Sequence, residues 1–314
     1  MSWKKAIGAR WGPEMLDKCT PMPCHEPGSP EWLEARRTYI GASEVAAVMG
    51  LSPYSTPRDV WMEKTGRSVE RETNLAMRAG TFMEPFILAE YEMVTGRKGH
   101  KPDVIYRSNS APWLAVNLDW LSDDGTIVAD AKRSEAPHLW GEAGTDDVPD
   151  GYFIQMQTQA FVTGVSMADL VALLPRNDLR IYPIMPDAGV QQRIVEATGE
   201  FWEKYVKTDT PPPLNEAAAT YLPSVKALYN QVEPRRVVLP DPVSITISKF
   251  IDVKKQIKEL EQEKAGLEAL ILDHIGNAEA AEVPGRYTLT RKLVEKKPYL
   301  CTPKPYTQLR IKEI

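Results

Sequence analysis

The N-terminal third of the chain combines helical spacing of apolar residues with clear start and stop signals. Ser29-Pro30 and Thr56-Pro57 each place an N-cap residue before a proline, a pair that commonly opens a helix. The pattern predicts helices over about 30–37, 43–49, 57–65 and 75–95, with Ser43 as the N-cap of the second. A glycine follows each of the last three segments, as expected at a helix C-terminus.

After residue 96 the apolar positions change to the alternation typical of strands. Strands are predicted at 104–106, 113–119, 126–132, 169–174 and 179–184, with Asp123-Asp124-Gly125 as the turn between the second and third. Further helices are predicted at 152–162 and about 189–206. These elements indicate an α/β (α+β) fold with a central mixed sheet flanked by helices.

Beyond Pro240 the apolar residues follow alternating three- and four-residue steps, which is the heptad pattern. They are Phe250, Val253, Ile257, Leu260, Leu267 and Ile271, with Lys264 interrupting the series. Such a helix can brace the core, form an oligomer contact or bind a partner, and the sequence leaves these alternatives open. We therefore expect an extended lead-in (1–28), a core (29–235), a heptad-like helical segment (236–282) and a basic strand and tail (283–314).

Composition excludes several classes of protein. Hydrophobic residues make up 43% and charged residues 26% of the 314 residues, which is ordinary globular usage. No apolar run approaches the roughly 20 residues that cross a bilayer, so we expect no membrane segment. Three cysteines and the absence of a signal-like N-terminus predict a soluble, cytoplasmic protein with reduced thiols.

The charge of the chain is unevenly distributed. The net charge is −5, yet residues 286–312 hold eight Lys or Arg against one acid, so the rest of the chain carries about −12. A solubilising tail is the ordinary explanation. A basic segment on an otherwise acidic chain also fits a protein that binds DNA through the basic segment and uses carboxylates to bind a metal ion.

The most informative chemistry lies around the predicted hairpin. Asp119 and Asp130 end adjacent strands, so their carboxylates can converge on one divalent cation, and such oxygen ligands favour Mg²⁺ or Mn²⁺. Lys132 follows on the same strand face as Asp130. A cation and an ammonium group beside a bound water suit phosphodiester hydrolysis. Acid-x-Lys pairs are common by chance, and only this one has the strand, the turn and a preceding aspartate.

Two neighbouring elements carry further candidates. Glu84, on the predicted helix 75–95, is either a solvated acid or a third metal ligand. Gln155, at the start of the helix after the hairpin, either faces water, caps the helix, or orients Lys132 or a phosphate. The cysteines and histidines show no zinc or iron–sulfur spacing, and no Walker-type loop is present.

With these residues in place the sequence resembles YqaJ-type viral recombinases, the family of phage lambda exonuclease within the PD-(D/E)xK nuclease superfamily. The motifs that carry the resemblance follow in family order: Glu31-Trp32 to Ser43, Gly50 to Tyr54, Trp61 to Gly66, Gly80 to Glu84, Asp119, Asp130-Ala131-Lys132, and Tyr152 to Gln157. They cover about residues 30–205. One departure is Asp130, where the family usually has the longer glutamate.

The resemblance implies a restriction-endonuclease-like core and a role for each matching residue. Asp119, Asp130, the Ala131 carbonyl and Glu84 would hold the metal, Lys132 would be the catalytic lysine, and Gln155 its supporting amide. Arg36 and Ser43 would contact the 5′-phosphate of DNA, which agrees with the forked guanidinium and the donors of a helix N-terminus. The alternatives are a salt bridge for Arg36 and a plain N-cap for Ser43.

The resulting hypothesis is a Mg²⁺-dependent exonuclease, with Mn²⁺ as a possible substitute, that digests linear double-stranded DNA. The 5′ to 3′ direction, a homotrimer and a single-strand annealing protein as partner follow from the resemblance alone. Two alternatives remain: an endonuclease on the same core, and a non-catalytic DNA-binding or assembly protein that acts through the heptad helix and basic tail.

Overall fold

The computed structural model describes residues 17–68, 74–214, 221–229 and 231–293. The chain divides into two compact units, 1–230 and 231–314, and each is described by itself. Much of the predicted lead-in and the basic tail after residue 293 lie outside the described residues.

A five-stranded mixed sheet forms the centre of the first unit. Its order is β3-β6-β7-β8-β9, and only β7 and β8 run parallel. The strands are β3 (Gly99–His100), β6 (Trp120–Ser122), β7 (Ile127–Arg133), β8 (Met167–Leu174) and β9 (Asp178–Ile184). The mixed sheet predicted from the sequence is thereby confirmed.

A second, four-stranded sheet of order β1-β4-β5-β2 belongs to the same unit. Its strands are β1 (Cys19–Pro23), β4 (Val104–Ser108), β5 (Leu114–Val116) and β2 (Ile40–Gly41). The predicted single strand over 113–119 is therefore wrong, because β5 pairs with β4 and β2 whereas β6 pairs with β7. Both short strands are buried, so hydrophobicity could not reveal the break between them.

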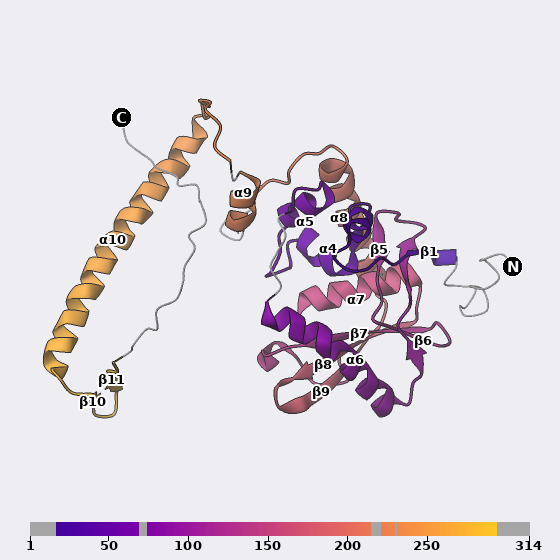
Figure 1. The fold of residues 1–314 in the computed structure, drawn as a ribbon, viewed down its shortest axis with the longest axis horizontal. Helices are drawn as coiled ribbons and strands as arrows, with labels where there is room; N and C mark the ends of the chain where they lie inside the picture. Colours follow the sequence, from indigo (N-terminus) through magenta and orange to yellow (C-terminus); the bar gives the residue numbers. More distant parts are fainter. Residues whose placement is uncertain (1–16, 69–73, 215–220, 230, 294–314) are drawn as a thin grey trace. The chain divides into compact units, whose positions relative to one another are not determined.

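Helices cover both faces of the five-stranded sheet. The described helices of the first unit are α3 (Pro30–Arg36), α4 (Ala42–Val48), α5 (Pro57–Lys64), α6 (Leu75–Thr95), α7 (Asp150–Thr163), α8 (Ala188–Phe201) and α9 (Leu222–Leu228). α7 and α6 lie on opposite faces of β7 and β8 (Figure 1). One face of these strands packs with Ile154 of α7, and the other packs with Ile87 and Tyr91 of α6. The predicted α/β class with a helix-flanked sheet is confirmed.

The helix ends follow the predicted capping chemistry at two of three sites. The side chains of Ser29 and Thr56 accept hydrogen bonds from the backbone N–H of Trp32 and Asp59. Ser43, however, is not an N-cap. Gly41 occupies that position, and the Glu44 carboxylate accepts from its N–H at 2.6 Å. The acid three residues after the cap satisfies this donor and makes the serine cap unnecessary.

The predicted helix 189–206 has an irregular end. α8 stops at Phe201, and Trp202–Val206 form a π-helical segment. A Cβ added at Gly199 would lie 2.9 Å from the Trp113 ring, so only glycine fits where this helix crosses the core.

The second unit consists of a long helix and a hairpin. The predicted heptad segment is one helix, α10 (Pro242–Ile275), followed by the antiparallel strands β10 (Ala280–Val283) and β11 (Tyr287–Thr290). Arg291 donates to the Gly276 carbonyl at 2.6 Å and so ties the hairpin to the end of α10. Among the residues described in either unit, no helix is both long and apolar enough to span a bilayer.

Candidate active site

The β6–β7 ladder brings the two predicted aspartates together. Trp120 pairs with Ala129, so Asp119, one residue before β6, lies opposite Asp130 of β7. The Asp119 Oδ2 atom accepts a hydrogen bond of 3.4 Å from the Ala131 backbone N–H. The predicted convergence of these carboxylates is therefore found, although Asp119 precedes a strand instead of ending one.

Two amides of α7 hold Asp130. The Nε2 atoms of Gln155 and Gln159 donate to its Oδ2 atom at 2.8 and 3.1 Å. All three side chains are buried, and the two glutamines are four residues apart, so they lie on the same face of the helix. Gln155 thus fixes a carboxylate. The sequence-based expectation that it orients Lys132 is not what the hydrogen bonds show.

Lys132 lies beside Asp130 on the same face of β7. Its ammonium forms an ion pair with Asp130 and lies 5.5 Å from the centre of the Tyr152 ring. Burial opposes the charge on Lys132, but Asp130 and Asp119 outweigh this effect and raise its pKa. Lys132 is consequently held as a cation between the carboxylates and α7.

The surroundings of Asp119 disfavour its charged form. Burial and the charge of Asp130 raise its pKa to about 8, and Glu84 adds to this effect, while Lys132 and Lys101 oppose it. A carboxyl with this pKa is mostly protonated at neutral pH. The pair therefore has more negative charge than its own surroundings can stabilise.

Glu84 belongs to the same charge cluster, since it contributes to the pKa of Asp119. Its carboxylate accepts a 2.6 Å hydrogen bond from Lys101, which also lies near Asp119. α6, which carries Glu84, is fastened to β8 by Tyr91, whose hydroxyl donates to Asp169 at 2.6 Å. A buried hydrogen bond thus holds in place the helix that brings the third acid to the site.

The donor set fits a hard divalent cation. The charge of Asp130 helps to raise the pKa of Asp119, and a cation beside both carboxylates would offset this repulsion. Carboxylate and carbonyl oxygens are preferred ligands of Mg²⁺ and Mn²⁺. Within the described residues no cluster of three or more His, Cys, Asp or Glu side chains is close enough to hold a metal by itself. The groups that could hold such a cation are the Asp119 and Asp130 carboxylates and the Ala131 carbonyl, with Glu84 in the same charge cluster.

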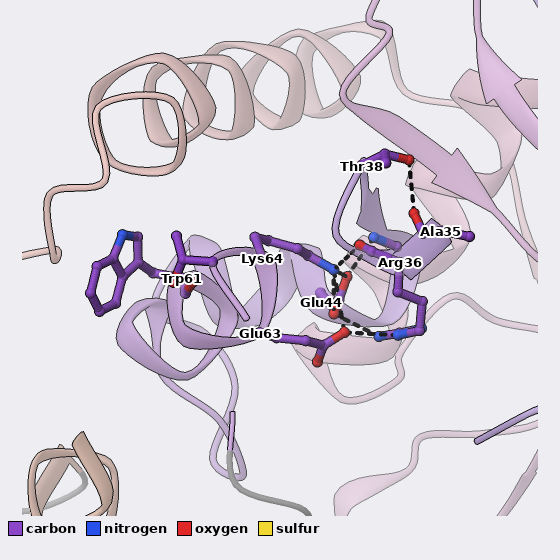
Figure 2. A network of polar contacts seen from close by, with 9 residues as sticks. Ala35, Arg36, Thr38, Glu44, Trp61, Glu63 and Lys64 are labelled. Atoms are coloured by element: carbon purple, nitrogen blue, oxygen red, sulfur yellow. Dashed lines mark hydrogen bonds and ion pairs between the residues drawn. The ribbon is translucent and has the colours of Figure 1, made fainter. Parts of the chain in front are cut away.

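The predicted phosphate contacts are Arg36, at the end of α3, and Ser43, at the start of α4. Figure 2 shows Arg36 in a charge network with Glu44, Glu63 and Lys64. Arg36 donates to Glu63 at 2.8 Å and to Glu44 at 2.6 Å. These bonds match the salt-bridge alternative, and a phosphate at Arg36 would compete with two carboxylates. Ser43 is exposed near the start of α4.

Lys64 is the centre of this network. Its side chain is fully buried and donates to both oxygens of Glu44, at 2.9 and 2.7 Å, and to the Arg36 carbonyl at 3.0 Å. Burial acts to raise the pKa of Glu63, but Lys64 and Arg36 reverse this and lower it to about 2. The network locks α3, α4 and α5 together.

Sequence reasoning missed Gln159, Lys101 and the Glu44–Lys64 pair. Gln159 had a readable signal, because it follows Gln155 by one helical turn. Lys101 and Lys64 had none, since their partners are 17 and 20 residues away and only the tertiary fold joins them. Gln157 belongs to the Tyr152 to Gln157 motif, but its side-chain oxygen accepts a hydrogen bond of 2.9 Å from the Asp187 backbone N–H.

The first unit thus has a mixed sheet with two aspartates and a lysine at the β6–β7 ladder. This arrangement defines a class of proteins with a carboxylate–lysine site suited to a divalent cation. Residues 31–166 match the model of the YqaJ-like viral recombinase domain, and the resemblance predicted from the sequence is thereby confirmed. The candidate metal ligands Asp119, Asp130, Ala131 and Glu84 all lie inside these matched residues.

Individual relatives share modest sequence identity with this chain. The chain is 28% identical over 255 residues to "Uncharacterized protein YqaJ" of Bacillus subtilis (strain 168), covering 79% of each chain. An alkaline exonuclease (LHK-Exo) from Laribacter hongkongensis is 23% identical, with a TM-score of 0.48, covering 58% of this chain and 94% of the other. A phage-related exonuclease from Haemophilus somnus 129PT is 14% identical, with a TM-score of 0.44, covering 55% and 96%.

Proposed function

We propose that this protein is a Mg²⁺-dependent deoxyribonuclease that digests linear duplex DNA from its 5′ ends and leaves 3′ single strands. The observation that carries the proposal is the meeting of Asp119, Asp130 and Lys132 at the β6–β7 ladder. The YqaJ-like viral recombinase domain supports a nuclease role. End polarity, a trimeric assembly and a single-strand annealing partner are parts of the proposal that rest on family resemblance.

Each residue has a distinct task in this proposal. Asp119, Asp130 and the Ala131 carbonyl would hold the cation, and Gln155 and Gln159 keep the Asp130 carboxylate in place. A bound cation would lower the pKa of a coordinated water and compensate the charge that builds up on the phosphate. Lys132, held as an ammonium, would position the attacking water and stabilise the same charge.

A hydrolysis assay tests the proposal. The purified protein with linear duplex DNA and Mg²⁺ should release nucleotides, and EDTA should abolish the release. Lys132→Met should lower the rate on the order of a hundredfold or more, because it removes the only cation that pairs with Asp130 within the described residues. No digestion of linear duplex, or an undiminished rate in this variant, would remove the assignment.

The form of the substrate separates exonuclease from endonuclease. A covalently closed circular duplex should not be digested, whereas the same DNA should be degraded once a single cut has made it linear. Cleavage of the closed circle would establish the endonuclease alternative, and metal-independent binding without any cleavage would establish the non-catalytic one.

The role of Arg36 needs its own test because Glu44 and Glu63 already bind it. If Arg36 also contacts a 5′-phosphate, Arg36→Ala should narrow the difference in rate between 5′-phosphorylated and 5′-hydroxyl ends. An unchanged difference, together with a loss of thermal stability, would assign Arg36 to the charge network alone.

A further inference from the structure

α10 presents an apolar face that no other described part of its unit covers. None of its 34 residues is buried. The heptad residues of this face are all exposed: Phe250 51%, Val253 44%, Ile257 51%, Leu260 62%, Leu267 55% and Ile271 47%. Since a helix in water gains most of its stability from packing such a face, the face requires an occupant.

Charges beside this face are divided between the two halves of the helix. With Phe250 and Ile257 at the first heptad position, the flanking positions of the N-terminal half hold Lys249 and Lys254. In the C-terminal half, the charged residues at the flanking positions are all acidic: Glu261, Glu263 and Glu268. One half of the helix is thus complementary in charge to the other half.

We propose that α10 pairs with α10 of a second copy of this chain as an antiparallel coiled coil in which Ile257 lies opposite Leu260 of the second copy. In the same register Phe250 lies opposite Leu267 of the second copy, so the apolar layers of the two helices coincide. The contact is two-fold symmetric, because each copy contributes the same surface.

Charge favours this orientation over the parallel one. In the antiparallel pair Lys254 flanks Glu261 of the second copy, and this attraction occurs twice by symmetry. In a parallel pair Lys249 would meet Lys254 of the second copy and Glu263 would meet Glu268. Parallel packing therefore brings like charges together at both ends, and like charges in contact oppose association.

Lys264, which interrupts the apolar series, fits the same orientation. In an antiparallel pair it lies opposite Val253 of the second copy, where its aliphatic stem can cover the valine while the ammonium reaches water. A parallel pair would bring two Lys264 ammonium groups together inside the interface.

This inference does not depend on the nuclease site, which belongs to the other unit. It also selects one occupant among those that the heptad pattern allows. The core of the same chain or another protein could cover an apolar face, but neither accounts for the charge complementarity between the two halves of α10.

The test is the self-association of the full chain, measured by sedimentation equilibrium. Lys254→Glu should weaken it about tenfold, because two attractive pairs become repulsive. Adding Glu261→Lys to this variant should restore the association, since each pair is then attractive again with its signs exchanged. Lys255→Glu is the matched control. It makes the same change in net charge at an outward-facing position that is 77% exposed, and it should change the association less than twofold.

Three results would overturn the inference. If the full chain stays monomeric, the apolar face of α10 is covered by the core of the same chain or by another protein. Equal effects of Lys254→Glu and Lys255→Glu would place any self-association elsewhere. Stronger association of Lys254→Glu would indicate the parallel orientation, because that change removes the Lys249–Lys254 repulsion.

Discussion

The chemistry at residue scale rests on charges that the protein alone does not balance. Asp130 accepts from two amide donors and pairs with an ammonium, whereas Asp119 accepts a longer hydrogen bond, of 3.4 Å, from the Ala131 backbone N–H. The result is an unequal pair, with the pKa of Asp119 raised to about 8. A cation between the carboxylates would relieve this strain.

The raised pKa of Asp119 predicts how cation binding depends on pH. Below about pH 8 the proton on Asp119 competes with the cation, so affinity for Mn²⁺ should rise about tenfold per pH unit from pH 6 and level off above pH 8. Titration calorimetry at several pH values measures this slope. Asp119→Asn, which has no proton to displace, should abolish it, and a flat profile in the parent protein would contradict the electrostatic account.

The buried ion network predicts a large loss of stability for Lys64→Met. Removing the ammonium leaves Glu44 with one charged partner in a buried position, which should cost about 3–5 kcal/mol of unfolding free energy. Urea titration measures the loss. Lys204→Met, at a side chain that is 59% exposed, is the control and should leave the unfolding free energy nearly unchanged. Equal effects would show that the network is energetically unimportant.

Glu63 predicts acid sensitivity in the same network. Its pKa is lowered from 4.5 to about 2, so its stabilising contribution is present above pH 4.5 and is lost as the pH falls toward 2. The unfolding free energy of the parent protein should therefore fall by on the order of 2 kcal/mol more than that of Glu63→Gln over this range. Parallel pH profiles for the two proteins would contradict this assignment.

At the scale of elements, local signals predicted helices better than strands. The bounds of α6 and the start of α5 follow from Asn74, Thr56-Pro57 and Gly96, which act within a few residues. The break between β5 and β6 was not predictable, because two buried strands separated by Asn117–Asp119 look like one apolar strand. Ser43 was assigned wrongly for a related reason, since the backbone conformation of Gly41 decides the cap.

The candidate site shows the same division. Asp119, Asp130 and Lys132 were predictable because one hairpin joins them, and hairpin register is a local property. The partners that tune their charges come from α6, α7 and residue 101, and the fold alone brings these elements together.

Close packing of β3 against β6 predicts an effect of Gly99→Ala on the site. A Cβ at Gly99 would lie 2.4 Å from both the Leu121 carbonyl oxygen and the Trp120 ring, so β6 must move, and Asp119 directly precedes β6. We expect a loss of about 2–3 kcal/mol in stability and a lower hydrolysis rate. Gly80→Ala in α6, where a Cβ meets nothing within 4 Å, is the control and should leave stability equal or slightly higher. Normal stability and activity of Gly99→Ala would show that β3 does not position the site.

At the scale of the whole molecule, the two units have separate tasks in this account. The first contains the acidic site and the residues that match the YqaJ-like viral recombinase model, and the second contains a helix with an uncovered apolar face. Coupling between copies through α10 would keep more than one candidate active site in an assembly. Variants of α10 should therefore change self-association without changing the hydrolysis of short duplexes by each site.

The most direct test of the central claim compares two aspartates of one hairpin. Initial rates of Mg²⁺-dependent hydrolysis of a linear duplex should fall on the order of a thousandfold in Asp119→Asn. They should stay within about twofold in Asp123→Asn, whose side chain is 67% exposed at the turn between β6 and β7. Equal rates in the two variants, or full activity of Asp119→Asn, would contradict a shared cation at Asp119 and Asp130.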